Sequence, residues 1–465
     1  MKKLFAMCVG MLLATTLVAS QAKYVFYFIG DGMGPVEVQG TEYYLAQVEG
    51  KLGIKPLCFA SFPYAGYVTT YSASSDVTDS SAAGTALACG VKINNGAIGI
   101  LPGTGEFTSS VSDWAKATGK SVGITTSVGV NHATPAAFFG HRPSRNDYYE
   151  LGVQLTESGY DFFAGGDFIN PTKDDEPSLY ELSEKAGYVI ARGYDDYKAK
   201  KNCGKPIILF QKEGIGTDIP YAVDAREGDL TLDQIVTAAI EQLSKNKKGF
   251  FLMCEGGQID HGGHANDAIA CLGDVVSMDD AIKVAYEFYK KHPKETLIIV
   301  TADHETGGLA LTGGGYSINT GVLQYQKVSK HGFSQVLNQL RHEKKDKVEW
   351  ADAKAALMEN FGFWKEVQLT HDDEMKLYDE WYHSFASNEK VKMAESLYFK
   401  DEPLSDLAVR IINRIAKVSW PVGSHSGSYV PVFAVGAGAE QFTGRIDNTD
   451  IPKKIAKIAG YKVKK

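Results

Sequence analysis

Three short apolar segments of the chain end abruptly in polar or glycine residues. They are residues 24–29 before Gly30-Asp31, residues 249–254 before Glu255, and residues 296–300 before Thr301-Ala302-Asp303. Continuous apolar runs of this length are typical of strands that are buried on both faces. We therefore predict three strands whose carboxyl ends carry Asp31, Glu255 and Asp303.

Helical patterns lie between these strands. Residues 232–243 repeat apolar positions at helical spacing, and residues 280–289 do so after a capping box that begins at Ser277. Alternating strands and helices predict an α/β fold with a central, mostly parallel sheet flanked by helices on both faces. In such sheets, ligands bind beyond the carboxyl ends of the strands.

A different pattern covers residues from about 343 to 419. The strand signals fade there, and charged amphipathic helices are predicted at residues 351–360, 372–385 and 407–416. A strand pattern resumes at residues 429–435, just after a loop that holds His425. We interpret residues 23–465 as one catalytic domain with a helical insertion at about 343–419, before the last core strands.

Composition excludes several classes of protein. The chain has 465 residues, of which 44% are hydrophobic and 22% charged, as in ordinary globular proteins and unlike disordered or fibrous ones. Its 48 Lys and Arg residues are outnumbered by 56 Asp and Glu residues, and no long basic run occurs. We therefore expect no nucleic-acid partner.

The first residues predict export. Lys2 and Lys3 precede an apolar stretch at residues 4–19 and then Ser20-Gln21-Ala22, which suits a signal peptidase. We predict a cleaved signal peptide at residues 1–22 and a periplasmic or extracellular protein without stable membrane insertion. An uncleaved anchor is the alternative, but the run is shorter than the roughly 20 residues that a span needs. Five cysteines remain after cleavage, an odd number whose pairing cannot be deduced.

Two segments contain candidate phosphate-binding residues. Asp79-Ser80 precedes small residues that continue to Gly90, which predicts a tightly packed helix with Ser80 in its first turn. The positive end of a helix dipole favours an anion there, and an ordinary N-cap serine is the alternative. Further on, Arg145 follows Thr134 at a spacing of eleven residues and suits a forked contact with two phosphate oxygens, unless it is a surface arginine.

Other segments contain candidate metal ligands. Residues 255–264 place Glu255, Asp260, His261 and His264 within ten residues directly after a predicted strand. Their glycine pairs disfavour a regular helix, so we expect a folded loop that wraps a metal, with a solvated charged loop as the alternative. Asp303-His304 and His425 add further carboxylate and imidazole groups, which suit divalent metals.

Taken in this order, the motifs resemble those of the alkaline phosphatases of the two-zinc, one-magnesium, serine-nucleophile type over nearly the whole mature chain. The resemblance implies a phosphomonoesterase in which Ser80 forms a phosphoserine intermediate, with retention at phosphorus, and Arg145 holds the phosphate. It implies one zinc on Asp260, His264 and His425. It implies a second zinc on Asp31, Asp303 and His304, and magnesium on Asp31, Thr134 and Glu255. A homodimer is also implied, with a monomer as the alternative.

The chain departs from the best-known bacterial pattern at two positions. His132 and His261 stand where that pattern has Asp and Lys, as in the animal enzymes. Because imidazole favours the softer ion, zinc is the alternative to magnesium at the third site. Residues expected to support the ligands without binding the metals are Asp79, His132, His141 and His261.

Related activities compete with this interpretation. A phosphodiesterase or a sulfatase of the same wider superfamily would share the metal ligands, but the sulfatase motif Cys-x-Pro-x-Arg is absent and diesterases usually have Thr in place of Ser80. A carboxyl-ester hydrolase would need a Gly-x-Ser-x-Gly elbow, which is also absent. A secreted binding protein without catalysis is the alternative from another class. We predict an exported, metal-dependent phosphomonoesterase of broad substrate range.

Overall fold

The computed structural model describes residues 21–214, 216–312, 315–387 and 390–463 of the chain. The first 20 residues, which make up most of the predicted signal peptide, lie outside the described residues. Ala22 is buried, and its backbone N–H donates to the carbonyl of Ile458 at 3.1 Å. Among the described residues, no helix is both long enough and apolar enough to span a membrane.

Ten of the described strands form one sheet, in the order β14-β2-β13-β8-β1-β7-β3-β4-β6-β5. Neighbouring strands are parallel except at β13, which is antiparallel to both β2 and β8. This confirms the predicted mostly parallel sheet, and the predicted strands are β1, β7, β8 and β13. The strands of the sheet are β1 (Tyr24–Gly30), β2 (Tyr64–Thr69), β3 (Ser121–Thr126), β4 (Phe162–Gly165), β5 (Val189–Arg192), β6 (Ile207–Phe210), β7 (Phe250–Gly256), β8 (Thr296–Ala302), β13 (Val430–Gly436) and β14 (Gly444–Asp447).

Two short antiparallel pairs lie outside this sheet. They are β9 (Glu305–Thr306) with β12 (His425–Ser426), and β10 (Ala394–Glu395) with β11 (Lys400–Asp401). The helices are α1 (Pro35–Val48), α2 (Ser80–Cys89), α3 (Val111–Ala117), α4 (Ala133–Ala136), α5 (Tyr148–Glu157), α6 (Leu179–Lys185), α7 (Gly193–Lys200), α8 (Leu232–Leu243), α9 (Gln258–His264), α10 (Ala268–Lys291), α11 (Lys330–Glu343), α12 (Trp350–Phe361), α13 (His371–Trp381), α14 (Pro403–Ala416) and α15 (Asp450–Ala459).

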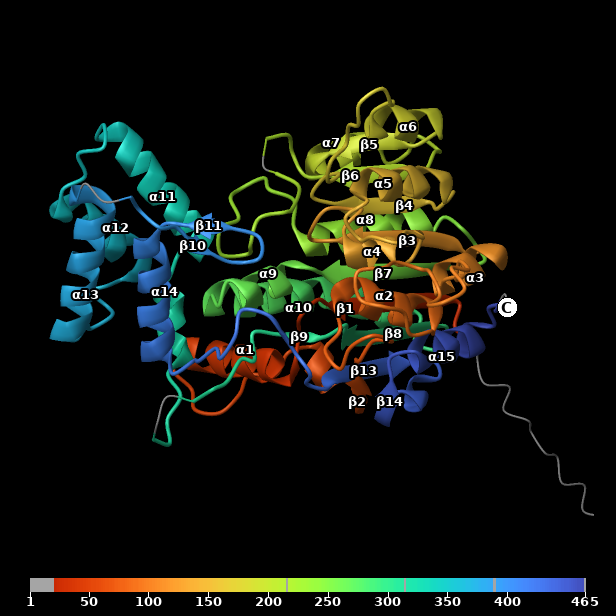
Figure 1. Cartoon of the computed structure of the whole chain (residues 1–465). Coiled ribbons are helices and arrows are strands. Elements are labelled where there is room, and N and C mark those ends of the chain that lie inside the picture. The colour runs from red at the N-terminus through yellow and green to blue at the C-terminus, as the bar shows by residue number, and fades with distance from the viewer. Residues whose placement is uncertain (1–20, 215, 313–314, 388–389, 464–465) are drawn as a thin grey trace, which may run out of the picture.

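Helices cover both faces of the sheet, as predicted (Figure 1). Alternate residues of β1 show why its sequence is apolar throughout. Phe26 points to one face and packs edge-to-face on Phe288 of α10. Tyr27 points to the other face, where its ring meets Phe138 and its hydroxyl donates to the carbonyl of Leu87 in α2. Both faces are therefore buried, and in sheets of this kind ligands bind at the carboxyl ends of the strands.

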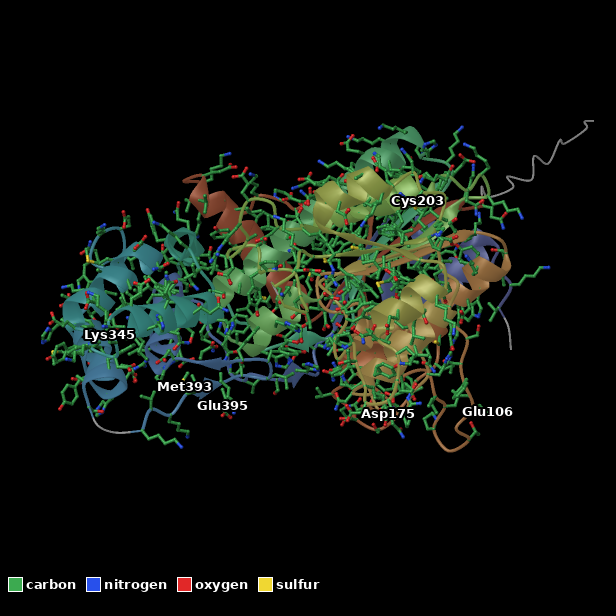
Figure 2. The ribbon with its side chains drawn as sticks, turned by 90° about the horizontal axis from the view of Figure 1, so that it is seen from above. Glu106, Asp175, Cys203, Lys345, Met393 and Glu395 are labelled. Atoms are coloured by element: carbon green, nitrogen blue, oxygen red, sulfur yellow. The ribbon has the colours of Figure 1, made fainter. Side chains whose placement is uncertain are left out.

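The insertion forms a helical lobe beside the sheet (Figure 1). Its buried residues make a second apolar cluster, separate from the core of the sheet, which includes Phe333, Leu357, Leu377 and Ile412. This cluster takes in α11, so the packed segment begins before residue 343. Figure 2 shows Lys345 in this lobe, on the opposite side of the molecule from Cys203.

The structure corrects two helix predictions. The helix expected at residues 280–289 is part of the longer α10, which begins at Ala268 and is capped by the Asp267 side chain, so the capping box at Ser277 is wrong. Asp267 accepts from the Ala270 backbone N–H in the manner of an N-cap. Residues 258–264 form the helix α9 rather than an irregular loop. The five cysteines among the described residues are all free.

Candidate active site

Three carboxylates meet at the carboxyl edge of the sheet. β1 lies between β7 and β8, and its residue Ile29 pairs with Glu255 on one side and Thr301 on the other. Asp31 and Asp303 follow directly after β1 and β8, two positions beyond the level of Glu255 in the strand register. All three side chains are buried. Parallel strands thus bring Asp31 close to two acidic groups that are more than two hundred residues away in the sequence.

One cluster consists of Asp31, Asp303 and His304, whose potential ligand atoms all lie within 4.8 Å of one another. His304 Nε2 is 3.3 Å from Asp31 Oδ1 and 3.2 Å from Asp303 Oδ2. The Thr306 hydroxyl donates to Asp260, so the contact of 3.2 Å between His304 Nδ1 and Thr306 Oγ1 needs a proton on Nδ1. The lone pair of Nε2 therefore faces the carboxylates, as a metal ligand requires.

Asp260, His264 and His425 form an adjoining cluster. The Nε2 atoms of the two histidines are 3.1 Å apart, and Nε2 of His264 is 3.3 Å from Asp260 Oδ1. Each histidine uses its other nitrogen on a backbone carbonyl: Nδ1 of His264 donates to Gly423 at 2.7 Å, and Nδ1 of His425 donates to Thr78 at 2.9 Å. Both Nε2 atoms are therefore left with a lone pair for a shared cation.

A third group contains Asp31, His132 and Glu255, with ligand atoms again within 4.8 Å of one another. Thr134 adds a hydroxyl, which donates to Asp31 Oδ2 at 3.5 Å. Thr126, at the end of β3, donates a hydrogen bond to Glu255. His132 thus lies among the potential ligands of this third group, although the sequence placed it in a supporting role.

Several polar atoms at the three groups are buried and have no hydrogen-bond partner. They are Asp31 Oδ1, Glu255 Oε1, Asp303 Oδ2, His132 Nδ1, and Nδ1 and Nε2 of His261. A buried polar atom without a partner is costly, and such atoms are rare in folded proteins. Carboxylate oxygens and imidazole nitrogens that converge in this way fit divalent cations, which satisfy them directly.

The raised pKa values of the carboxylates agree with a site that binds cations. Burial raises the pKa of Glu255 to about 7 and that of Asp303 to about 7. Burial also raises the pKa of Asp31 well above its ordinary value, and the Asp303 carboxylate adds to the effect. Without a cation, these groups resist ionisation because they repel one another in a region that excludes water.

Asp260 and the histidines behave differently. Burial opposes ionisation of Asp260, but the nearby imidazoles of His264 and His425 outweigh it and hold the pKa of Asp260 below its usual value. Burial lowers the pKa of His304 and of His132 well below the ordinary histidine value. Both are therefore neutral near pH 7, which is the form that binds metals.

Ser80 is the first residue of α2 and lies beside His304, which follows the end of β8. It is buried, and its Oγ is 3.2 Å from His304 Nε2. Asp79 caps the helix by accepting from the Ala82 backbone N–H at 3.0 Å. Asp79 also accepts from Nη1 of Arg145 at 3.3 Å, so the guanidinium is held beside the first turn of α2. A hydroxyl, a helix N-terminus and a cation therefore converge, as phosphate binding requires.

Comparison with known proteins identifies the family. A family model described as alkaline phosphatase matches residues 22–161 and 169–461. The chain belongs to the alkaline phosphatase family. Alkaline phosphatase 3 of Bacillus subtilis is 31% identical over 454 residues, which cover 96% of this chain and 90% of that protein. The predicted resemblance is confirmed, and the chain is a phosphatase enzyme.

Solved structures of alkaline phosphatases share the fold. The cold-active alkaline phosphatase from Shewanella sp. matches with a TM-score of 0.79 at 27% identity, over 94% of this chain and 99% of that one. A variant of the alkaline phosphatase from the Antarctic bacterium TAB5, with Mg bound in its M3 site, matches with a TM-score of 0.66 at 25% identity, over 96% of this chain and 99% of that one.

Sequence reasoning missed three residues that this alkaline phosphatase fold brings to the site. Thr306 donates to Asp260 Oδ1 at 2.5 Å, and Tyr398 donates to Asp260 Oδ2 at 3.1 Å. Asp218 Oδ2 lies 3.6 Å from Nδ1 of His261. Thr306 follows Asp303-His304 closely and could have been included with them, but no motif surrounds Asp218 or Tyr398.

Two predicted supporting residues differ in their surroundings. The ring of His261 lies 3.6 Å from that of Tyr398, at the edge of the third group. His141 contacts another part of the chain: its Nε2 is 2.6 Å from the carbonyl of Thr108, and its ring stacks on Phe107. Support of the ligands by His141 therefore stays a prediction.

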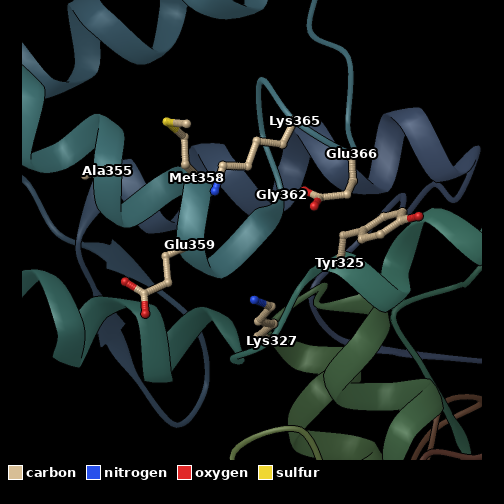
Figure 3. Close-up of a pocket in the computed structure, with 8 residues that line it drawn as sticks. All are labelled: Tyr325, Lys327, Ala355, Met358, Glu359, Gly362, Lys365 and Glu366. Atoms are coloured by element: carbon tan, nitrogen blue, oxygen red, sulfur yellow. The ribbon is translucent and has the colours of Figure 1, made fainter.

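Cavities also lie beside the ligand groups and away from them. One of about 490 Å³ adjoins the site, with His264, Gly423 and Ser424 in its wall. The other, of about 410 Å³, lies in the insertion between Tyr325, Lys327 and α12 (Figure 3). Its lysine and glutamate side chains are shown in Figure 3, and no residue of the three groups lines it. The cavity in the insertion is therefore separate from the candidate ligand groups.

Proposed function

We propose that this alkaline phosphatase is an exported, metal-dependent phosphomonoesterase that acts through a phosphoserine intermediate at Ser80. The observation that carries the proposal is the place of the Ser80 hydroxyl, 3.2 Å from His304 and at the N-terminus of α2. A nucleophile, a phosphate clamp and three groups of metal ligands share one edge of the sheet, and this combination suits phosphoryl transfer.

The donor sets fit three divalent cations. We assign one zinc to Asp260, His264 and His425, whose facing atoms lie within 3.6 Å of one another. We assign a second zinc to Asp31, Asp303 and His304. A third ion would be held by Asp31, Thr134 and Glu255, with His132 among the potential ligands. We assign magnesium there, and zinc is the alternative because of the imidazole of His132. When bound, the ions act as Lewis acids that stabilise the serine alkoxide and the departing oxygen.

The residues of the chain supply the nucleophile and the phosphate clamp. Ser80 gives its hydroxyl proton to solvent, and its Oγ forms a bond to phosphorus while the bond from phosphorus to the ester oxygen breaks. The ester oxygen takes up a proton from solvent and leaves as the alcohol, and Arg145 holds two of the phosphoryl oxygens in a forked contact during the transfer. Water then attacks phosphorus and gives up a proton, the bond from phosphorus to Ser80 Oγ breaks, Oγ takes up a proton, and inorganic phosphate is released. Two in-line steps give net retention at phosphorus.

A phosphodiesterase is the nearest alternative, and substrate comparison separates the two activities. Arg145 favours a monoester because the monoester has an additional nonbridging oxygen for the guanidinium. We expect the zinc- and magnesium-loaded enzyme to hydrolyse an aryl phosphate monoester with a kcat/KM far above that for the corresponding diester. Removal of the metals with a chelator abolishes both reactions, and added zinc restores the monoesterase. A diester preference would overturn the proposal.

Three predictions about the whole protein accompany this proposal. If the protein is exported, the mature protein from a secreting host begins near residue 23, which N-terminal sequencing checks.

If the protein is a homodimer, sedimentation gives twice the mass of one chain. Broad specificity predicts similar kcat/KM values on sugar, nucleotide and aryl phosphates, because the assigned residues address only the phosphoryl group.

A further inference from the structure

The insertion reaches the metal-binding edge of the sheet through one short hairpin. The strands β10 and β11 pair Ala394 with Asp401 and Glu395 with Lys400, which leaves residues 396–399 as the tip. The backbone N–H of Ser396 donates to the carbonyl of Phe399 at 2.9 Å and closes this tip. In Figure 1 the hairpin extends from the helices of the insertion toward α9, which carries Asp260.

The hairpin is fixed at its base by contacts with α11. The buried carboxylate of Asp401 accepts from Nδ1 of His331 at 2.9 Å, and the ring of Phe399 stacks on the same histidine at 4.1 Å. The next residue, Glu402, accepts two hydrogen bonds from Arg341 at 3.0 and 2.9 Å. These anchors place the tip, so Tyr398 occupies a defined position at the site.

Tyr398 contacts three residues of α9, and its ring lies edge-on to that of His264 with 5.6 Å between the centroids. Its hydroxyl donates to Oδ2 of Asp260 at 3.1 Å, and its ring centroid is 3.6 Å from that of His261. Asp260 is fully buried, and its other oxygen, Oδ1, faces His264 at 3.3 Å. The hydrogen bond from Tyr398 therefore holds the carboxylate with Oδ1 directed at the histidines of its cluster.

We propose that Tyr398 is a positioning residue that orients Asp260. Through this contact, the helical insertion sets the affinity for the first zinc, which is the one assigned to Asp260, His264 and His425. This inference rests on the proposed function, because it takes Asp260 as a ligand of that metal. Hydrogen bonds to a ligating carboxylate typically change metal affinity by about 10- to 100-fold, which is the size of effect that a single phenolic hydroxyl can have here.

The test compares zinc retention in matched variants of the full mature protein. Tyr398→Phe removes the hydroxyl and keeps the ring against His261, while Tyr378→Phe removes the hydroxyl of an exposed tyrosine in the same insertion. Each zinc-loaded protein is mixed with excess chromogenic chelator. We expect Tyr398→Phe to release its first zinc about 10-fold or more faster than the wild type, and Tyr378→Phe to release it at the wild-type rate.

A double-mutant comparison shows whether Tyr398 acts through Asp260. In an Asp260→Asn background, Tyr398→Phe should change the rate of zinc release by less than about twofold, because the carboxylate that it orients is gone. An unchanged release rate in the single variant overturns the proposal, as does an equal change in both backgrounds. Loss of the fold in excess zinc also overturns it, since Tyr398 would then be a packing residue.

The same experiment keeps the inference separate from the proposed function. Zinc release is measured without turnover, and hydrolysis of a phosphate monoester is measured in parallel. A wild type that holds zinc but hydrolyses no monoester would refute the proposed function and leave the role of Tyr398 to be decided by the release rates. A wild type that holds no zinc would refute both.

Discussion

At the scale of single residues, the backbone orients the candidate ligands before any cation binds. The carbonyls of Gly423 and Thr78 accept from His264 and His425, so each imidazole presents Nε2 to the cluster. Glu255 is similarly held by the hydroxyl of Thr126. Ligand geometry of this kind is prepared by the fold, which reduces the conformational entropy lost on metal binding.

Arg145 provides a test of the phosphate clamp. Arg145→Ala removes a cation whose side chain is only 19% exposed and which lies 3.3 Å from Asp79 beside Ser80. We expect kcat/KM for a phosphate monoester to fall by about 10²-fold, and inhibition by inorganic phosphate to weaken, because the phosphoryl oxygens lose a charged donor.

The neighbouring Arg142 is a suitable control for this variant. It forms an ion pair with Asp147 at 2.8 Å instead of facing Ser80. Arg142→Ala should leave kcat/KM and phosphate inhibition near the wild-type values. Equal losses in the two variants, measured by steady-state kinetics, would contradict the assignment of Arg145.

Site residues that lie in recognisable motifs could be predicted from the sequence, and site residues outside such motifs could not. Asp31 and Asp303 stand directly after apolar runs, so a strand and its carboxyl end locate them. Tyr398 reaches Asp260 across 138 positions of the chain. That contact depends on how the insertion docks, and no local pattern of hydrophobic and polar residues specifies such docking.

At the scale of elements, the glycines of α9 explain why the helix was not predicted. Glycine is unfavourable inside a helix, so the pair Gly262-Gly263 indicated a loop. In the structure, a Cβ at Gly262 would lie 2.6 Å from the backbone nitrogen of Cys271 in α10. The glycines are therefore present for close packing of α9 on its neighbours, and this tertiary requirement outweighs helix propensity.

This packing predicts the effect of substitutions at two helical glycines. Gly262→Ala forces a shift of α9 against the backbone of α10, which should lower the free energy of unfolding by about 1–3 kcal/mol and weaken zinc binding. Gly273→Ala in α10 meets only the Cβ of Ala222 at 3.9 Å and should be neutral or stabilising by up to about 1 kcal/mol. Urea unfolding of both variants checks this, and equal stability of the two would contradict the packing argument.

At the scale of the whole molecule, the site joins segments that are distant in the sequence. The three ligand groups draw on the ends of β1, β7 and β8, on α4 and α9, and on β12, and Tyr398 adds the insertion. The α/β alternation was enough to predict a mostly parallel sheet, because its central strands β1, β7 and β8 are apolar on both faces. The extent of the helical lobe was harder to predict, since α11 joins it by tertiary packing alone.

The buried carboxylates predict how stability depends on pH when the metals are removed. The pKa of Glu255 is raised from 4.5 to about 7 in the folded protein. The contribution of Glu255 to the free energy of unfolding of the metal-free protein should therefore be fully present below the ordinary pKa of 4.5. It should be lost as the pH rises through about 7. Asp303 contributes in the same direction, since its pKa is raised from 3.8 to about 7.

Thermal unfolding in excess chelator measures this dependence. We expect the melting temperature to fall between about pH 5 and about pH 8, to recover on addition of zinc, and to fall less in Glu255→Gln, which has no charge to bury. A metal-free melting temperature that rises over this interval would show that the carboxylates are not strained by burial.

The central claim is that Ser80 is the nucleophile of a metal-dependent phosphomonoesterase, and one kinetic measurement tests it most directly. The rate of hydrolysis of a chromogenic phosphate monoester at mildly alkaline pH is compared for metal-loaded wild type, Ser80→Ala and Ser81→Ala. Ser81 is the adjacent buried serine, and its hydroxyl donates to Asp79 at 2.7 Å. We predict rapid hydrolysis by the wild type, a loss of about 10³-fold or more in Ser80→Ala, and a much smaller loss in Ser81→Ala. Equal rates for the wild type and Ser80→Ala would contradict the account.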